Sequence, residues 1–146
     1  MAEEAIRVID PEAPRTIRMP WNPQGAPQVR RALVDDLTEL GVSPDVIDEA
    51  EIVVAELVSN SLRHARPLSD GCLRVRWKTK GGVVEVEVTD GGGPSTPRPA
   101  PPALWANSGR GLRIVRSLAH EWGVHEEKHG RTVWASLGGP SRRRTH

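Results

Sequence analysis

The stretch from Cys72 to Val88 constrains the fold more than any other part of the chain. It contains two segments in which apolar residues alternate with polar ones, CLRVRWK and VVEVEV, separated by the glycine pair Gly81-Gly82. Such alternation predicts strands with one apolar and one solvated face, and the glycine pair predicts the tight turn of a hairpin. Because the apolar face of a sheet must be buried, this hairpin requires a second layer on one side.

Helical patterns on both sides of the hairpin predict that second layer. Residues 26–41 carry apolar residues at helical spacing and end at Gly41, while the next helix begins with Ser43 as N-cap and extends to about Arg66. A further helix is expected from Gly111, and further strands are expected at residues 15–21, 122–127 and 132–137. Strands grouped in hairpins predict an α+β two-layer sandwich, with a mixed or antiparallel sheet and helices on one face.

The composition narrows the classes of partner. The chain has 146 residues, which suits one domain, and a net charge of +1, which gives no general attraction to nucleic acid or membranes. The single cysteine, Cys72, excludes an internal disulfide, and no apolar run approaches the roughly 20 residues that cross a bilayer. The acidic first residues lack the features of a signal peptide. We therefore expect a cytoplasmic protein that does not bind nucleic acid directly.

A long segment rich in proline and glycine interrupts the regular pattern after the hairpin. It runs from Thr89 to Gly111 and shows no periodic core pattern, which is typical of a functional lid or of a disordered insert. The predicted organisation is a flexible N-terminus over residues 1–14, one domain over 15–138 with a lid at about 91–109, and a basic flexible tail over 139–146.

Three polar motifs follow one another along the chain. Glu56 and Asn60 lie one turn apart on the second helix, in the sequence ELVSNSLRHA. Asp90 follows the strand VEVEV and precedes three glycines, and the sequence SGRGL, residues 108–112, opens the next helix. Singly, these motifs have ordinary interpretations: a solvated strip on a helix, a tight turn after a strand, and a glycine at a helix start.

Taken together, the motifs suit a bound nucleotide. A carboxylate at a strand end accepts a hydrogen bond from the amino group of adenine, and the glycines after it let the backbone approach the base. Glycines at a helix start bring free N–H groups and the positive end of the helix dipole to phosphates. Asn60 offers an oxygen to Mg²⁺, and Glu56 can act as a general base one turn away.

In this order, over about residues 15–137, the motifs resemble those of the GHKL ATPase superfamily, and most closely those of the bacterial anti-sigma factor serine kinases. ELVSNSLRHA resembles the N-box, TDGGGP the first glycine box, GRGL the second glycine box and GRTVWASL the closing strand. The resemblance implies a Bergerat-type sandwich in which the proline-rich segment forms a lid over ATP.

The resemblance also assigns roles to residues. Glu56 is the expected general base, Asn60 the expected ligand of ATP-bound Mg²⁺, and Asp90 the expected acceptor for adenine. The other expected ATP contacts are Gly92, Gly109, Arg110, Gly111, Leu112 and Thr132, the last of these near the adenine aspartate through water.

The activity implied by the resemblance is that of an ATP- and Mg²⁺-dependent serine/threonine kinase. Such a protein binds an RNA polymerase sigma factor and phosphorylates a small antagonist protein, and it forms a homodimer through its first strand and helix. The sequence departs from the first glycine box at Pro94, where the pattern has glycine; proline fixes φ and removes an N–H. Two alternatives remain open: a regulatory binding module without phosphotransfer, and an ATP hydrolase without a protein substrate.

Overall fold

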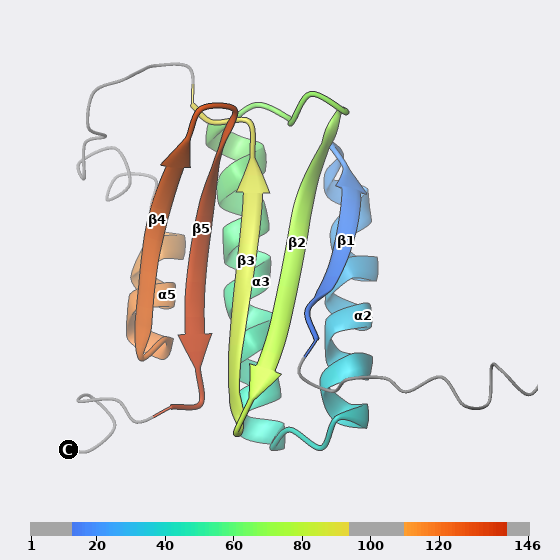
Figure 1. Ribbon diagram of the computed structural model, residues 1–146, viewed down its shortest axis with the longest axis vertical. Coiled ribbons are helices and arrows are strands. Elements are labelled where there is room, and N and C mark those ends of the chain that lie inside the picture. The colour runs from blue at the N-terminus through green and yellow to red at the C-terminus, as the bar shows by residue number, and fades with distance from the viewer. Residues whose placement is uncertain (1–12, 94–109, 140–146) are drawn as a thin grey trace, which may run out of the picture.

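The computed structural model describes residues 13–93 and 110–139, with only the helical backbone described for 110–112. One five-stranded antiparallel sheet has the strand order β1-β2-β3-β5-β4. The helices lie on one of its faces and leave the other face open (Figure 1). The elements in chain order are β1 (Arg15–Pro20), the 3-10 helix η1 (Pro23–Gly25), α2 (Ala26–Glu39), α3 (Pro44–His64), β2 (Cys72–Lys80), β3 (Val83–Asp90), α5 (Arg110–Leu118), β4 (Glu121–Glu127) and β5 (Gly130–Leu137).

The core lies between the sheet and the helices, and alternation along the strands supplies its sheet side. Every second residue of the three central strands is buried beneath the helices: Leu73, Val75, Trp77, Val84, Val86, Val88, Val133, Ala135 and Leu137. The intervening residues of β2 and β3 are mostly charged and lie on the open face. Gly81 and Gly82 have φ values of 58° and 83°, as the tight turn between these strands requires.

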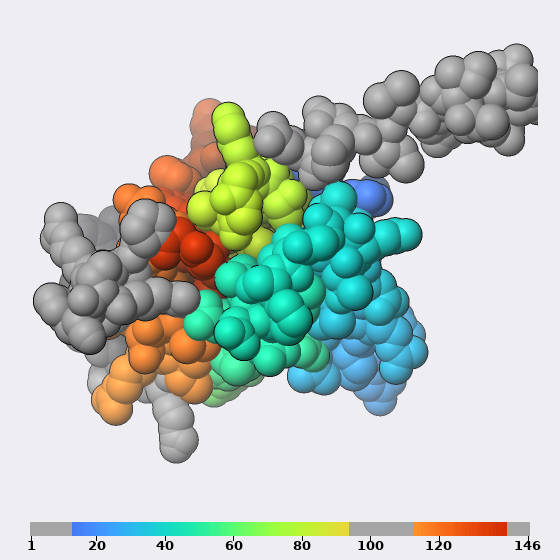
Figure 2. Space-filling view, turned by 90° about the horizontal axis from the view of Figure 1, so that it is seen from below, coloured from blue at the N-terminus to red at the C-terminus, as the bar shows by residue number. Residues whose placement is uncertain are grey.

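Helix α3 is the central element of the helical layer and lies between α2 and α5 (Figures 1 and 2). The hydroxyl of Ser43 caps its N-terminus by accepting from the N–H of Val46, and Pro44 begins the helix. Its apolar residues are buried over a wide arc, as the sequence predicts for a helix covered on most sides: Ile47, Ala50, Val53, Val54, Leu57 and Val58. The helix ends at His64, two residues before the predicted end.

The predicted α+β two-layer sandwich is confirmed, and the sheet is antiparallel throughout the described residues. The 3-10 turn at Pro23–Gly25 was not predicted. The predicted flexible N-terminus, most of the predicted lid and nearly all of the predicted tail lie outside the described residues. None of the helices within residues 13–93 and 110–139 is both long enough and apolar enough to cross a membrane.

Candidate nucleotide-binding site

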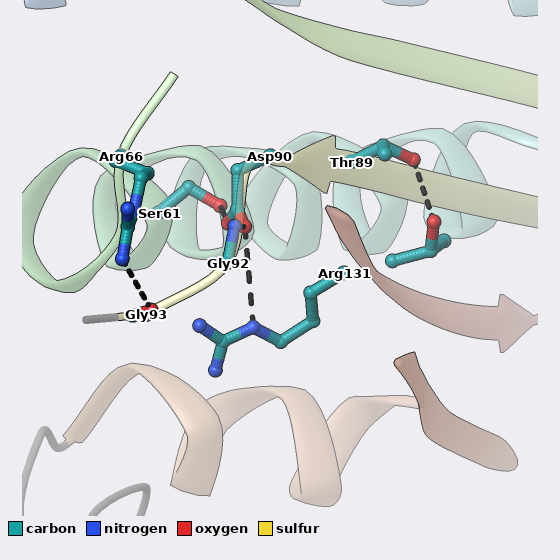
Figure 3. Close-up of polar contacts among 8 residues, drawn as sticks. Ser61, Arg66, Thr89, Asp90, Gly92, Gly93 and Arg131 are labelled. Carbon is teal, nitrogen blue, oxygen red and sulfur yellow. Dashed lines mark hydrogen bonds and ion pairs between the residues drawn. The ribbon is translucent and has the colours of Figure 1, made fainter. Parts of the chain in front are cut away.

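Asp90 is the buried acidic residue at the C-terminal end of β3. It continues the inward-facing series of Val84, Val86 and Val88, so its carboxylate points toward the helical layer, and only 2% of the residue is exposed. Its Oδ2 accepts a hydrogen bond from the hydroxyl of Ser61 on α3 at 2.5 Å, and its Oδ1 accepts from the N–H of Gly92 at 2.8 Å (Figure 3). Helix α3 and the loop after β3 therefore fix the carboxylate from two sides.

A buried arginine lies next to this carboxylate. Arg131 of β5 is the cross-strand partner of Asp90, and its Nε lies 3.9 Å from Asp90 Oδ1 (Figure 3). Arg131 is 6% exposed, so the two opposite charges form a pair largely removed from water. An arginine keeps its charge in proteins and, when buried, needs a counterion such as this carboxylate.

The net effect of these surroundings is to raise the pKa of Asp90 above its ordinary value of 3.8. Burial is the largest cause, because it disfavours the charged carboxylate. The hydrogen bonds from Ser61 and Gly92 and the charge of Arg131 oppose that effect, while the negative charge of Glu126 adds to it. Burial thus makes ionisation of Asp90 less favourable than in water, despite its three favourable partners.

The glycines after Asp90 are required by the close approach of their loop to the end of α3. The N–H of Gly91 donates to the carbonyl of Arg66 at 2.7 Å, and the N–H of Arg66 donates to the carbonyl of Gly92 at 3.1 Å. A Cβ on Gly91 would lie 2.2 Å from the carbonyl oxygen of Pro67, and Gly92 has a φ of 91°. Side chains are thus excluded at Gly91 by contact and disfavoured at Gly92 by conformation.

Thr132, expected near the adenine aspartate through water, lies on β5 next to Arg131. It pairs with Thr89 across β3 and β5, one residue away from the Asp90 pair, and its Oγ1 lies 2.7 Å from Oγ1 of Thr89. Because neighbouring residues of a strand point to opposite faces, these hydroxyls lie on the open face of the sheet. The residue of β5 beside the aspartate is Arg131.

Glu56 and Asn60 lie one turn apart in the C-terminal half of α3. Asn60 is 6% exposed and precedes Ser61, the residue that contacts Asp90, while Glu56 is partly exposed one turn earlier. Among the described residues, no three His, Cys, Asp or Glu side chains cluster so as to hold a metal ion. Any Mg²⁺ here would take Asn60, water and ligand phosphates, which matches the preference of Mg²⁺ for few protein ligands.

Helix α5 is the remaining element of the predicted site. Gly109 lies outside the described residues, and Arg110, Gly111 and Leu112 form the first turn of α5. Helix α5 ends just before β4, and β4 runs toward Glu127, the strand end beside Gly130. The N-terminus of α5 therefore points to the same end of the sheet as Asp90, where its free N–H groups suit an anion.

Comparison with known proteins agrees with this geometry. A family model described as a histidine kinase-like ATPase domain matches residues 19–137, and the chain belongs to that family. The motif resemblance seen in the sequence is thereby confirmed at the level of the family, which is one of ATP-binding domains. A search of curated proteins finds no match.

The crystal structure of the RsbU and RsbW domains of Rv1364c from Mycobacterium tuberculosis is similar in fold. The similarity has a TM-score of 0.66 and 23% sequence identity, and it covers 89% of this chain. It covers 34% of the mycobacterial chain, so the present chain spans about a third of that protein's length.

Proposed function

We propose that this chain is an ATP- and Mg²⁺-dependent protein kinase of the anti-sigma type. It transfers the terminal phosphoryl group of ATP to a serine or threonine of a small antagonist protein, and it also binds an RNA polymerase sigma factor. The observation that carries the proposal is the buried Asp90 carboxylate, held at the end of the helix that bears Glu56 and Asn60, in a chain of the histidine kinase-like ATPase family.

Each residue has one task in the proposed reaction. Asp90 accepts a hydrogen bond from the adenine amino group, and Asn60 holds Mg²⁺, which would neutralise charge on the phosphates. The N-terminus of α5 with Gly109 and Gly111 receives the phosphates. Glu56 accepts the proton of the attacking hydroxyl as its oxygen forms a bond to the terminal phosphorus and the bond from that phosphorus to ADP breaks.

A nucleotide-binding regulatory module without phosphotransfer is the second candidate. Pro94 favours it, because proline at the start of the predicted lid removes an N–H and restricts the backbone. The position of Glu56, one turn before Asn60 on α3, favours the kinase. Hydrolysis of ATP without a protein substrate would use the same Glu56 to activate water, so transfer and hydrolysis must be measured separately.

The decisive experiment compares Glu56→Gln with Asn60→Ala. A pull-down from native lysate with and without ATP supplies the antagonist protein, radiolabelled phosphate transfer gives the activity, and calorimetry gives the ATP affinity. Glu56→Gln keeps the shape of the side chain, so ATP binding should persist while transfer falls by about 10² or more. Asn60→Ala should weaken Mg-ATP binding itself, because a metal ligand is lost.

Glu51→Gln is the matched control, because Glu51 lies on the same helix outside the strip of Glu56 and Asn60. It should leave both transfer and affinity unchanged. Unchanged transfer in Glu56→Gln would remove the assignment of the base. Absence of transfer in the parent protein, with tight binding of the partner, would favour the regulatory module.

A further inference from the structure

The arginine beside Asp90 is not needed for the proposed contact between that carboxylate and an amino group. A carboxylate has about four lone-pair positions on its two oxygens. Ser61 and the N–H of Gly92 occupy one position on each oxygen of Asp90, so the carboxylate can still accept from a ligand. Arg131 is therefore an additional charged donor at a place that already has its acceptor.

The guanidinium of Arg131 lies between Asp90 and Gly93. Its Nε faces Asp90 at 3.9 Å, and its Nη2 lies 2.8 Å from where a Cβ on Gly93 would be. In Figure 3 the group lies between the loop that follows Asp90 and helix α5. Gly93 thus leaves room for the guanidinium, and Asp90 compensates its charge.

A base that donates its amino group to Asp90 would lie close to Arg131. The guanidinium lies 3.9 Å from the accepting carboxylate, which is less than the length of a purine ring system. Moving the arginine away would leave a buried charge without its counterion, which is strongly unfavourable. The lower-energy outcome is for the guanidinium to remain and to bond the base.

Purine chemistry defines what such a contact selects. The amino group of adenine is a donor with an acceptor ring nitrogen on either side, N1 and N7. Asp90 is an acceptor for the amino group, and Arg131 beside it is a donor for the neighbouring ring nitrogen, so the pair matches adenine. Guanine placed in the same way presents its O6 acceptor to the carboxylate, and on the N1 side it presents a donor to the guanidinium. Guanine would therefore place an acceptor against the Asp90 carboxylate. If the N1 edge faces Arg131, it would also place a donor against the Arg131 donors.

We infer that Arg131 is a second base-contacting residue, which donates to the ring nitrogen beside the adenine amino group and selects adenine over guanine. The inference rests on the proposed nucleotide binding and adds to it a residue that determines specificity. The base site is then a buried carboxylate–guanidinium pair rather than a single carboxylate.

The test measures the affinities of ATP, GTP, 1-deaza-ATP and 7-deaza-ATP by calorimetry. The deaza analogues keep the amino group and each lack one ring nitrogen. One of them should bind the parent protein about tenfold or more weakly than ATP, the usual effect of losing a hydrogen bond to a charged donor. In Arg131→Met that analogue and ATP should bind equally, and the preference for ATP over GTP should decrease.

Two further variants keep the test informative even if Arg131→Met fails to fold. Arg131→Lys retains the charge and should recover part of the difference between ATP and the analogue. Arg74→Met, at an exposed arginine of β2 on the open face, is the matched control and should behave as the parent protein. If Arg131→Met does not fold, the parent and Arg131→Lys still give the comparison of ATP with the two analogues.

The outcomes separate this inference from the proposed function. Equal affinity of the parent for ATP and both analogues would overturn the role of Arg131 and leave the nucleotide site intact. A uniform loss of affinity for all four nucleotides in Arg131→Met, with the difference between ATP and the analogue unchanged, would also overturn it, because that is the result of a structural role. No binding of ATP by the parent would overturn the nucleotide site itself.

Discussion

The inward face of the β3–β5 strand pair has two parts: a long apolar part, and a polar part at the end of the ladder that consists of Asp90 and Arg131. Over most of their length the pair buries only apolar side chains against α3: Val84, Val86, Val88, Val133, Ala135 and Leu137. At the last pair in the ladder, the same inward face carries Asp90 and Arg131. The backbone arrangement is the same in both parts, so the change in side chains is a property of this sequence and not of the fold.

The comparison separates residues that stabilise the domain from residues that serve the site. Burial of apolar surface contributes to stability wherever it occurs. A buried ion pair contributes little on balance, because removing two charges from water offsets their attraction. The raised pKa of Asp90 shows that burial opposes its charged form even with three compensating partners, Ser61, Gly92 and Arg131. Strongly perturbed groups of this kind cluster at functional sites, which supports the proposed binding role of Asp90.

The largest expected effect on stability comes from the apolar part. Leu137→Ala removes a fully buried side chain from β5, which should lower the free energy of unfolding by about 2–5 kcal/mol. Urea unfolding measures the loss, with Val124→Ala at an exposed position of β4 as control. The increase in melting temperature caused by Mg-ATP should persist in Leu137→Ala. Its disappearance would mean that the two parts of the strand pair are not separable.

The second prediction concerns the polar part. Mg-ATP at 100 times its Kd should stabilise the parent protein by about 2.7 kcal/mol, because it binds only the folded state. Asp90→Asn should lose most of this increase, since the amide presents donors to the adenine amino group. Its stability without ligand should also fall, because buried Arg131 loses its counterion. Thermal unfolding with and without Mg-ATP measures both quantities.

The control for this variant is Asp36→Asn, which alters an aspartate of α2 that bonds Trp77 and Arg15 far from the site. Asp36→Asn should keep the full increase with Mg-ATP. A full increase in Asp90→Asn, or none in the parent protein, would contradict the assignment of Asp90.

The apolar part could be predicted from the sequence almost completely. Alternation defines the strands, Gly81-Gly82 defines their turn, and Ser43 with Pro44 defines the start of α3, all through interactions within a few residues. The positions of Glu56, Asn60 and Asp90 followed from motifs, and their roles stay predictions.

The sequence was less informative about contacts around Asp90. The alternation that places Val133 and Ala135 inward also places Arg131 inward and Thr132 outward, and this signal was available before the structure. The bond from Ser61 to Asp90 had no local signal, because it joins two elements 29 residues apart. Such partners depend on how α3 packs on β3, which no local pattern determines.

The third prediction concerns the loop that joins the polar part to α3. Gly91→Ala places a Cβ 2.2 Å from the backbone oxygen of Pro67, so the loop must move. The expected loss is about 1–3 kcal/mol in the free energy of unfolding, with a smaller increase in melting temperature from Mg-ATP. Gly25→Ala is the comparison variant: its Cβ would lie 2.9 Å from Cγ of the Met19 side chain, which can shift more easily than the backbone oxygen of Pro67, so it should cost less. Equal losses in the two variants would show that the Gly91 contact is not special.

The smallest expected effect is a dependence of stability on pH, which decides whether burial or Arg131 dominates at Asp90. A raised pKa means that the folded state holds a proton above pH 3.8, where the unfolded chain has begun to release it. Stability from this group should therefore be greatest below 3.8, fall as pH rises through the raised pKa, and then stay constant. Asp90→Asn lacks the titration, so the difference in unfolding free energy between the parent protein and this variant isolates it.

Urea unfolding of both proteins across this pH range measures the difference. A decrease with rising pH is the expected result, because burial is the largest influence on this carboxylate. An increase would mean that the charge of Arg131 and the hydrogen bonds of Ser61 and Gly92 outweigh burial. In that case the Asp90–Arg131 pair would stabilise the unliganded domain, as the apolar part of the same strands does, and the contrast between the two parts would be one of side-chain chemistry alone.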